Sequence, residues 1–310
     1  MPFFTDFTYD SSTGKNKIHA MICTPEGAPH GIVYLVHGLA EHIGRYSDFM
    51  LFLAEKGFVA VGNDHLGHGL SADGKTGFGF FSECNGWNYV VKDSEKLRSM
   101  MAERYPGIPY IVFGHSMGSF IVRTCLINNT DFCSGAILSG TAHPSSALLQ
   151  GGSAAKSILS KINRSEPDDQ ALFKNVLKKY SERIDSPRTE YDWISRDPEQ
   201  VDAFLSDIRC AFLPKKELFL DLLSGLTVIT DPDQIEKMNK EIPILFLSGK
   251  EDPVGEYGKG VMRAYSSFCR AGMHHVTLRL YPGGRHEMLH EINRSDVEND
   301  ILSWIEQTVL

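Results

Sequence analysis

The sequence lacks long hydrophobic runs, long basic runs and paired cysteine motifs. No stretch of about 18 uncharged apolar residues occurs, so a transmembrane helix is not expected. The six cysteines stand singly, without the C-x-x-C spacing of zinc clusters and dithiol redox sites, so we expect free thiols and no metal or other cofactor. The opening residues lack a basic segment followed by an apolar one, which predicts a cytoplasmic protein.

Acidic residues outnumber basic ones, and the net charge is −8. The longest basic runs are the pairs Lys178-Lys179 and Lys215-Lys216. Nucleic acid is therefore not an expected partner, because its phosphates repel a negative protein. With 310 residues, of which 42% are hydrophobic and 23% charged, the chain has ordinary globular composition and can bury a sufficient core without disulfides or metals.

Short apolar runs alternate with amphipathic stretches along most of the chain. Two strands come first and are expected at the edge of a sheet, at about 4–9 and 17–23. Six near-continuous apolar runs predict central strands covered on both faces, at 31–36, 58–62, 110–114, 135–140, 243–249 and 276–281. Helices are expected at about 47–55, 87–105, 116–128, 258–270 and 295–310. This alternation predicts an α/β fold with a mostly parallel central sheet and helices on both faces.

The segment from 141 to 235 interrupts this alternation, since it contains helical patterns and no strand-like run. In one of these patterns, an Asp197 cap precedes an apolar face of Val201, Phe204, Leu205 and Ile208. The segment is predicted to be a helical cap inserted after the sixth strand, with 1–140 and 236–310 as the core. Such an insertion lies over the carboxyl ends of the strands, where open α/β sheets bind ligands.

A G-x-S-x-G motif, Gly114 to Gly118, lies between the predicted strand 110–114 and the helix that follows it. This strand, sharp turn and helix are the context in which the motif presents a nucleophilic serine. Ser116 is therefore the candidate nucleophile. A serine hydroxyl is a poor nucleophile at neutral pH, so the motif also predicts a histidine base and an acid that orients the histidine.

Candidates for the acid and the base follow the serine in the expected chain order. Asp252 comes directly after the strand 243–249 and precedes a proline. His286 is the first histidine after the strand 276–281 and its glycine turn. For the oxyanion hole, which stabilises the charge of a tetrahedral intermediate, we expect the backbone N–H groups of Leu39 and Met117.

The residues His286 to His290 read H-E-M-L-H, which matches the H-E-x-x-H pattern of zinc peptidases. A zinc site needs both histidines on one helix and a further ligand. Gly283 and Gly284 immediately precede His286 and predict a loop there instead. We therefore interpret the match as coincidental, with Glu287 and His290 as local scaffold.

Five stretches resemble those of α/β-hydrolases, and more narrowly those of the monoacylglycerol lipase and lysophospholipase branch. They read HGLAEHIGRY (37–46), DHLGHGLS (64–71), GHSMGS (114–119), SGKEDPVG (248–255) and PGGRHEMLHE (282–291). The resemblance implies an α/β-hydrolase fold, with the same five site residues as above. It also implies that His65 and His68 shape the loop beside the site. The His-Gly-Gly-Pro-Gly motif of proline-releasing peptidases of this fold is absent.

The expected function is serine carboxylic-ester hydrolysis of monoacylglycerol or lysophospholipid-type acyl esters, with a small lipid-like ester as the partner. The cap, rich in leucine, is expected to line the acyl site and to touch membrane surfaces transiently. Two alternatives stay open: a small-ester, aryl-ester (feruloyl-type) or thioester hydrolase, and a catalytically silent ligand-binding protein on the same fold. The sequence gives no indication of the oligomeric state.

Overall fold

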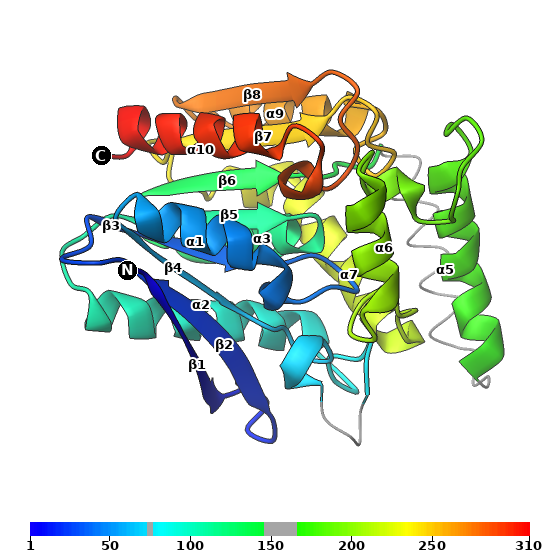
Figure 1. Ribbon diagram of the computed structural model, residues 1–310, viewed down its shortest axis with the longest axis horizontal. Coiled ribbons are helices and arrows are strands. Elements are labelled where there is room, and N and C mark those ends of the chain that lie inside the picture. Colours follow the sequence, from blue (N-terminus) through cyan, green and yellow to red (C-terminus); the bar gives the residue numbers. More distant parts are fainter. Residues whose placement is uncertain (73–76, 146–165) are drawn as a thin grey trace.

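A computed structural model describes residues 1–72, 77–145 and 166–310. Its central sheet has eight strands in the order β1-β2-β4-β3-β5-β6-β7-β8. The first two strands run antiparallel to their neighbours and the other pairs are parallel, which confirms the predicted mostly parallel sheet (Figure 1). The strands are β1 (Phe3–Asp10), β2 (Lys17–Thr24), β3 (Gly31–Val36), β4 (Phe58–Asn63), β5 (Tyr110–His115), β6 (Gly135–Ser139), β7 (Ile244–Gly249) and β8 (Val276–Tyr281).

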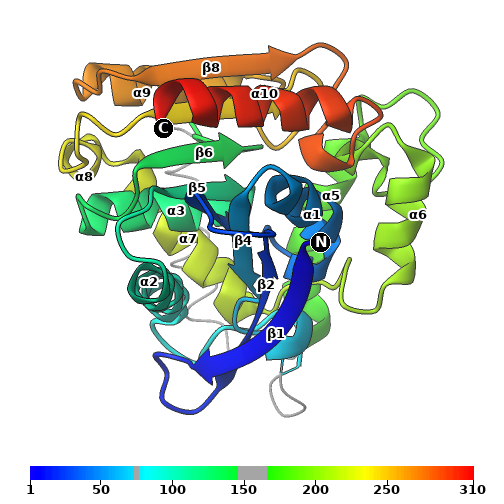
Figure 2. The same cartoon turned by 60° about the vertical axis from the view of Figure 1, so that its left-hand side comes forward.

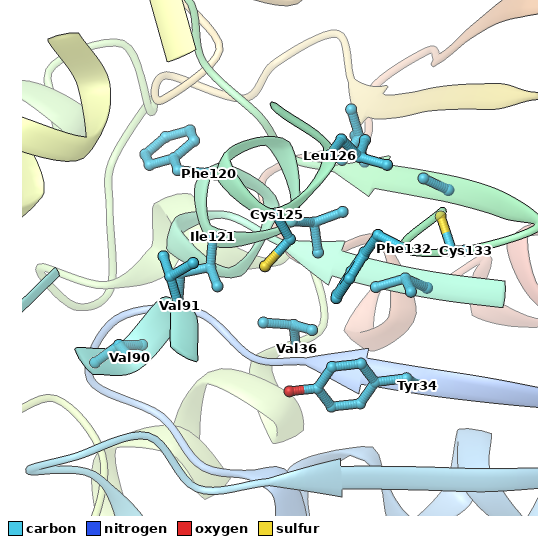
Figure 3. Close-up of a cluster of buried hydrophobic side chains, with 14 of the residues drawn as sticks. Tyr34, Val36, Val90, Val91, Phe120, Ile121, Cys125, Leu126, Phe132 and Cys133 are labelled. Carbon is cyan, nitrogen blue, oxygen red and sulfur yellow. The ribbon is translucent and has the colours of Figure 1, made fainter. Parts of the chain in front are cut away.

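Helices cover both faces of the sheet, as the alternating pattern predicted. Figure 2 shows α1 (Ser47–Glu55) and α10 (Arg294–Thr308) on one side and α2 (Gly86–Arg104) and α3 (Met117–Asn128) on the other. The helix α9 (Lys259–Arg270) contributes to the same apolar cluster as α2 and α3. Figure 3 shows how this cluster fills the space between α2, α3 and the sheet with side chains such as Val91, Ile121 and Tyr34.

Two expectations about the strands were wrong. β2 is not at the edge, because it pairs with β4 as well as with β1, and its His19 and Cys23 are buried along with the apolar residues. β8 was expected in the centre but is an edge strand, and its side chains alternate between half-buried and exposed. The two exposed positions of β8 carry the polar residues Thr277 and Arg279, which are a sign of an edge strand in the sequence.

The described part of the segment 141–235 follows the sixth strand and contains helices but no strand. Its helices are α5 (Glu166–Ser181), α6 (Pro198–Ser206), α7 (Lys216–Thr230) and the short α8 (Pro232–Ile235). Asp197 caps α6 by accepting the N–H of Glu199, as expected. Of the predicted apolar face, Val201 and Phe204 are buried, whereas Leu205 and Ile208 are exposed, which corrects that prediction. Residue 208 lies beyond the end of α6, where helical periodicity no longer applies.

A buried arginine of α3 ties both ends of this segment to the core. Arg123 donates to the carbonyl of Ala142 at 2.8 Å and to the carbonyl of Ile229 at 2.7 Å. Ala142 lies just after β6 and Ile229 lies near the end of α7. The cap therefore enters and leaves the core at one fixed point.

The helix α7 packs against α2 and α3 at a glycine. A Cβ placed on Gly225 would lie 2.3 Å from the indole ring of Trp87, on α2. Both residues are buried. A side chain at position 225 would therefore push α7 away from α2.

We expect Gly225→Ala to lower the free energy of unfolding by about 1 kcal/mol. Overpacking costs about 1–3 kcal/mol, and the better helix propensity of alanine offsets about 1 kcal/mol of this. Urea titration measures the change. The control is Ser99→Ala on the exposed side of α2, which should stay within about 0.5 kcal/mol of wild type. A Gly225→Ala protein more stable than wild type would contradict the observed packing.

Candidate active site

The turn between β5 and α3 holds Ser116 in a strained backbone conformation. Its φ is 52° and its ψ is −121°, a region that residues with a side chain rarely occupy. The turn is tight because a Cβ on Gly118 would lie 2.0 Å from the carbonyl oxygen of Val36. Ser116 therefore stands at the carboxyl end of the central strands, at the start of α3, as the motif predicted.

Asp252 and His286 meet although their strands end in different loops. His286 Nδ1 lies 3.0 Å from Asp252 Oδ1, and both side chains are buried. The same carboxylate oxygen accepts the N–H of Val254 at 2.9 Å, and Oδ2 accepts the hydroxyl of Ser248 at 3.1 Å. With Nδ1 donating to this carboxylate, the Nε2 atom of His286 is the basic nitrogen. Sequence reasoning missed Ser248, the last polar residue of β7 before the loop.

The surroundings of His286 favour its protonated form. Burial by itself lowers the pKa of His286, but the charge and hydrogen bond of Asp252, supported by Glu287 and Glu41, outweigh burial and raise that pKa above its ordinary value. The imidazolium that would form when His286 takes a proton is thus stabilised by the residues around it.

One cavity of about 420 Å³ joins the predicted residues. Ser116, His286, Leu39 and Met117 all line it, and Asp252 lies behind His286. Most of the other lining residues are apolar and come from the cap. They include Phe173, Val176, Leu177, Phe204, Phe212, Leu222, Leu223 and Leu226.

The loop that carries Leu39 is held on both sides of that residue. The N–H of Gly38 donates to Glu41 Oε1 at 2.5 Å, and His37 Nδ1 donates to the carbonyl of Gly38 at 2.8 Å. Ala40 has a φ of 57°, and its carbonyl accepts the N–H of Ala211 from the cap at 3.1 Å. Met117 begins α3, where the first N–H groups of a helix have no acceptor within the helix. Both backbone groups therefore have fixed positions beside Ser116.

Three buried histidines pack beneath this loop. The rings of His37 and His65 lie 4.1 Å apart, and His68 lies 5.4 Å from His37. Burial is the largest cause that lowers the pKa of His65 to about 3 and that of His68 to about 4, so both are neutral at physiological pH. Neither residue lines the cavity, so their contacts are those of a scaffold.

Arg45 forms a buried ionic network beside the site that sequence reasoning missed. Its guanidinium donates to Glu41 at 2.8 Å and binds both carboxylate oxygens of Glu287, at 2.8 and 2.6 Å. It also lies over the ring of Phe204 from α6, 4.8 Å from the centroid. Arg45 thus connects the Leu39 loop, the His286 loop and the cap.

The two histidines of H-E-M-L-H contact different groups, and Glu287 lies between Arg45 and His290, whose Nδ1 is 3.3 Å from Glu287 Oε2. His286 pairs with Asp252, Glu287 pairs with Arg45, and His290 Nε2 donates to the carbonyl of Arg45 at 3.0 Å. Residues Met288–His290 form a short 3-10 turn, not an α-helix that would direct both imidazoles at one metal.

One other group of metal-ligating side chains occurs in the described part of the chain. The ligand atoms of His42, Asp207 and Cys210 lie within 4.8 Å of one another. However, Arg209 binds both oxygens of the Asp207 carboxylate, at 3.0 and 2.7 Å, and His42 Nε2 lies 2.9 Å from one of them. The carboxylate is therefore already neutralised, and the group acts as a contact between core loop and cap. None of the helices in the described residues is long and apolar enough to cross a membrane.

Comparison with known proteins agrees with this geometry. The family described as "Serine aminopeptidase, S33" matches residues 27–293. The chain belongs to this family. It is 30% identical to a monoacylglycerol lipase of Mycolicibacterium smegmatis over 95% of both chains. It is 25% identical to human monoglyceride lipase, over 91% of this chain and 84% of the relative.

Solved structures support the same assignment. A thermostable carboxyl esterase from Bacillus coagulans, in complex with glycerol, is 33% identical and superposes with a TM-score of 0.90 over 99% of both chains. A monoglyceride lipase from Saccharomyces cerevisiae, 22% identical over 100% of this chain and 96% of the other, superposes with a TM-score of 0.73 and thus shares the fold. The chain is accordingly an α/β-hydrolase of the monoacylglycerol lipase-like branch, and a carboxylic-ester hydrolase.

We expect His286 to titrate above its ordinary pKa of about 6.5, because Asp252 outweighs the effect of burial. NMR titration of the imidazole, assigned with His286→Gln, measures this pKa. In Asp252→Asn the effect of burial remains and the opposing charge is gone, so the pKa should fall below that of the wild type. The buried His68, which has no carboxylate partner of this kind, is the internal control and should titrate near 4. A wild-type His286 that titrates below 6.5 would contradict the assignment of Asp252 as the dominant partner.

Proposed function

We propose that this chain hydrolyses monoacylglycerol or lysophospholipid-type acyl esters through Ser116, His286 and Asp252. The observation that carries the proposal is the position of Ser116 on the wall of a cavity lined mainly by apolar cap residues. An acyl chain needs such a lining, while the ester carbonyl needs polar groups at one point. The names of two relatives, a monoacylglycerol lipase and a monoglyceride lipase, imply substrates that are mostly apolar. Such substrates suit the same cavity.

The proposed mechanism follows from the positions of these groups. His286 Nε2 removes the proton of the Ser116 hydroxyl as this oxygen attacks the ester carbonyl. The oxyanion that forms accepts hydrogen bonds from the N–H groups of Leu39 and Met117. His286 then protonates the departing alcohol, and water repeats the sequence on the acyl-enzyme. Asp252 orients the imidazole and stabilises its charged form.

Aminopeptidase activity, which the family description suggests, is less well supported. An aminopeptidase must bind the positive amino terminus of its substrate, and a carboxylate free to pair with that charge would do so. Three carboxylates line the cavity in the described residues. Arg45 binds Glu41 and Glu287, and Arg263 binds Glu256. Each carboxylate therefore already has a cation partner, which favours an acyl ester over an aminoacyl substrate.

A substrate panel tests the proposal. It contains monoacylglycerols of graded chain length, a lysophosphatidylcholine, methyl ferulate, an acyl thioester and an aminoacyl anilide. We expect kcat/KM to be highest on a monoacylglycerol or the lysophospholipid, and Asp252→Asn to lower kcat on that substrate by about 10³–10⁴-fold. Preference for ferulate or the thioester would favour the small-ester or thioester alternative. Cleavage of the anilide alone would refute the proposal, and no turnover at all would favour a silent binding protein.

Contact of the cap with a membrane surface is a further part of the proposal. Ile208 is 83% exposed and Leu205 is 39% exposed, and Leu205 directly follows the cavity-lining Phe204. Exposed apolar side chains of the cap can enter the headgroup region of a lipid surface from which the substrate is taken.

Co-sedimentation with neutral phosphatidylcholine vesicles tests this contact. We expect Ile208→Ser with Leu205→Ser to reduce vesicle binding, because both substitutions remove exposed apolar area. The control is Met262→Ser, since Met262 is 45% exposed on α9, a core helix. Equal binding of the double variant, the control and the wild type would exclude the proposed contact.

A further inference from the structure

Four residues with hydroxyl groups line the cavity in the described part of the chain: Ser116, Tyr180, Tyr191 and Thr227. The hydroxyl of Tyr191 donates to the carbonyl of Ala211 at 3.2 Å, and that of Thr227 donates to the carbonyl of Leu223 at 2.9 Å. Ser116 is the proposed nucleophile. Tyr180 is left as a hydroxyl with no hydrogen-bond partner among the described residues, in a cavity that is otherwise mainly apolar.

The ring of Tyr180 has a defined position relative to the base. It packs against Trp193 with ring centroids 4.9 Å apart, and Trp193 packs against His286 at 5.3 Å. The carbonyl of Trp193 also accepts the N–H of His286. Tyr180 and Trp193 therefore form an aromatic wall that extends from the imidazole into the cap.

We expect this wall to face the alcohol half of the ester, given cleavage at Ser116. The histidine that removes the serine proton also delivers it to the departing oxygen, so the alcohol must leave on the side of His286. The leucines of α7, Leu222, Leu223 and Leu226, line the cavity as well. Their apolar side chains suit the acyl half. The two halves of an ester thus meet walls of different chemistry.

We propose that the Tyr180 hydroxyl recognises a free hydroxyl on the alcohol half of the substrate, and so selects esters of a polyol such as glycerol over esters of simple alcohols. The proposal rests on the proposed function, since it assumes ester cleavage at Ser116. A phenol can donate one hydrogen bond and accept another, which suits a substrate hydroxyl. Burial, with the charge of Asp252 in addition, raises the pKa of Tyr180, so the phenol stays protonated and available as a donor.

The recognition is expected to be specific because a substrate that forms a hydrogen bond to the unpaired hydroxyl binds more tightly in an apolar cavity. A substrate that lacks the hydroxyl leaves the phenol of Tyr180 unpaired. Tyr180 is therefore a specificity-determining residue, and its loss should affect polyol esters selectively.

The test compares two esters with the same acyl chain, 1-monooctanoylglycerol and ethyl octanoate. Tyr180→Phe keeps the ring against Trp193 and removes only the hydroxyl. We expect it to lower kcat/KM on monooctanoylglycerol by about 3–10-fold, mainly through KM, and to change kcat/KM on ethyl octanoate by less than about twofold. Tyr191→Phe is the matched control, because the hydroxyl of Tyr191 already donates to a backbone carbonyl. This variant should change kcat/KM on both substrates by the same factor.

The possible outcomes separate the two proposals. If the wild type does not cleave monooctanoylglycerol, the proposed function is wrong. If the wild type cleaves it well, and Tyr180→Phe lowers kcat/KM equally on both substrates or on neither, only the assignment to Tyr180 is wrong. Should Tyr180→Phe prove unstable in a thermal melt, the wild type alone decides: a higher kcat/KM for 3-hydroxypropyl octanoate than for propyl octanoate supports a hydroxyl-binding site, and equal values overturn it.

Discussion

The tight turn between β5 and α3 is the constraint on which the rest of the site depends. Ser116 occupies a strained conformation there, and Gly118 lies so close to β3 that a Cβ would fall 2.0 Å from the Val36 carbonyl oxygen. This close approach brings the loop after β3 against the nucleophile, with Gly38 beside Ser116. The strain destabilises the fold by about 1–3 kcal/mol, and the packing of the fully buried strand β5 offsets this amount.

Buried polar contacts then fix the loops that the sheet brings together. Asp252 has its carboxylate satisfied by Ser248, Val254 and His286, so the imidazole is held from behind. Arg45 joins Glu41 to Glu287 and thereby ties the Leu39 loop to the His286 loop. Such a network is costly to desolvate, and losing one partner leaves the others as unpaired buried charges. The network therefore holds one arrangement of the loops, and the cap packs onto this arrangement through Phe204 and Ala211.

Local patterns predicted much of this architecture, and pairing over long distances explains what they missed. Strand and helix positions follow from runs and periodicities within a few residues, and the chain order of Ser116, Asp252 and His286 follows from the fold's topology. The place of β2 and β8 in the sheet depends on which strands pair, which no local run records. The contact of Arg45 with Glu287 spans 242 positions, and the free hydroxyl of Tyr180 is recognisable only once its neighbours are known. The structure brings four of the five predicted site residues to one cavity and places the fifth, Asp252, behind His286.

Covalent trapping measures whether Ser116 is a nucleophile activated by its surroundings. A fluorophosphonate reacts with activated serines, and peptide mass spectrometry identifies the residue that carries the adduct. We expect a single adduct on Ser116 in the wild type, none in Ser116→Ala, and much slower labelling in His286→Ala because the base is missing. An adduct on another residue, or equal labelling of Ser116→Ala and the wild type, would contradict the nucleophilic role of Ser116.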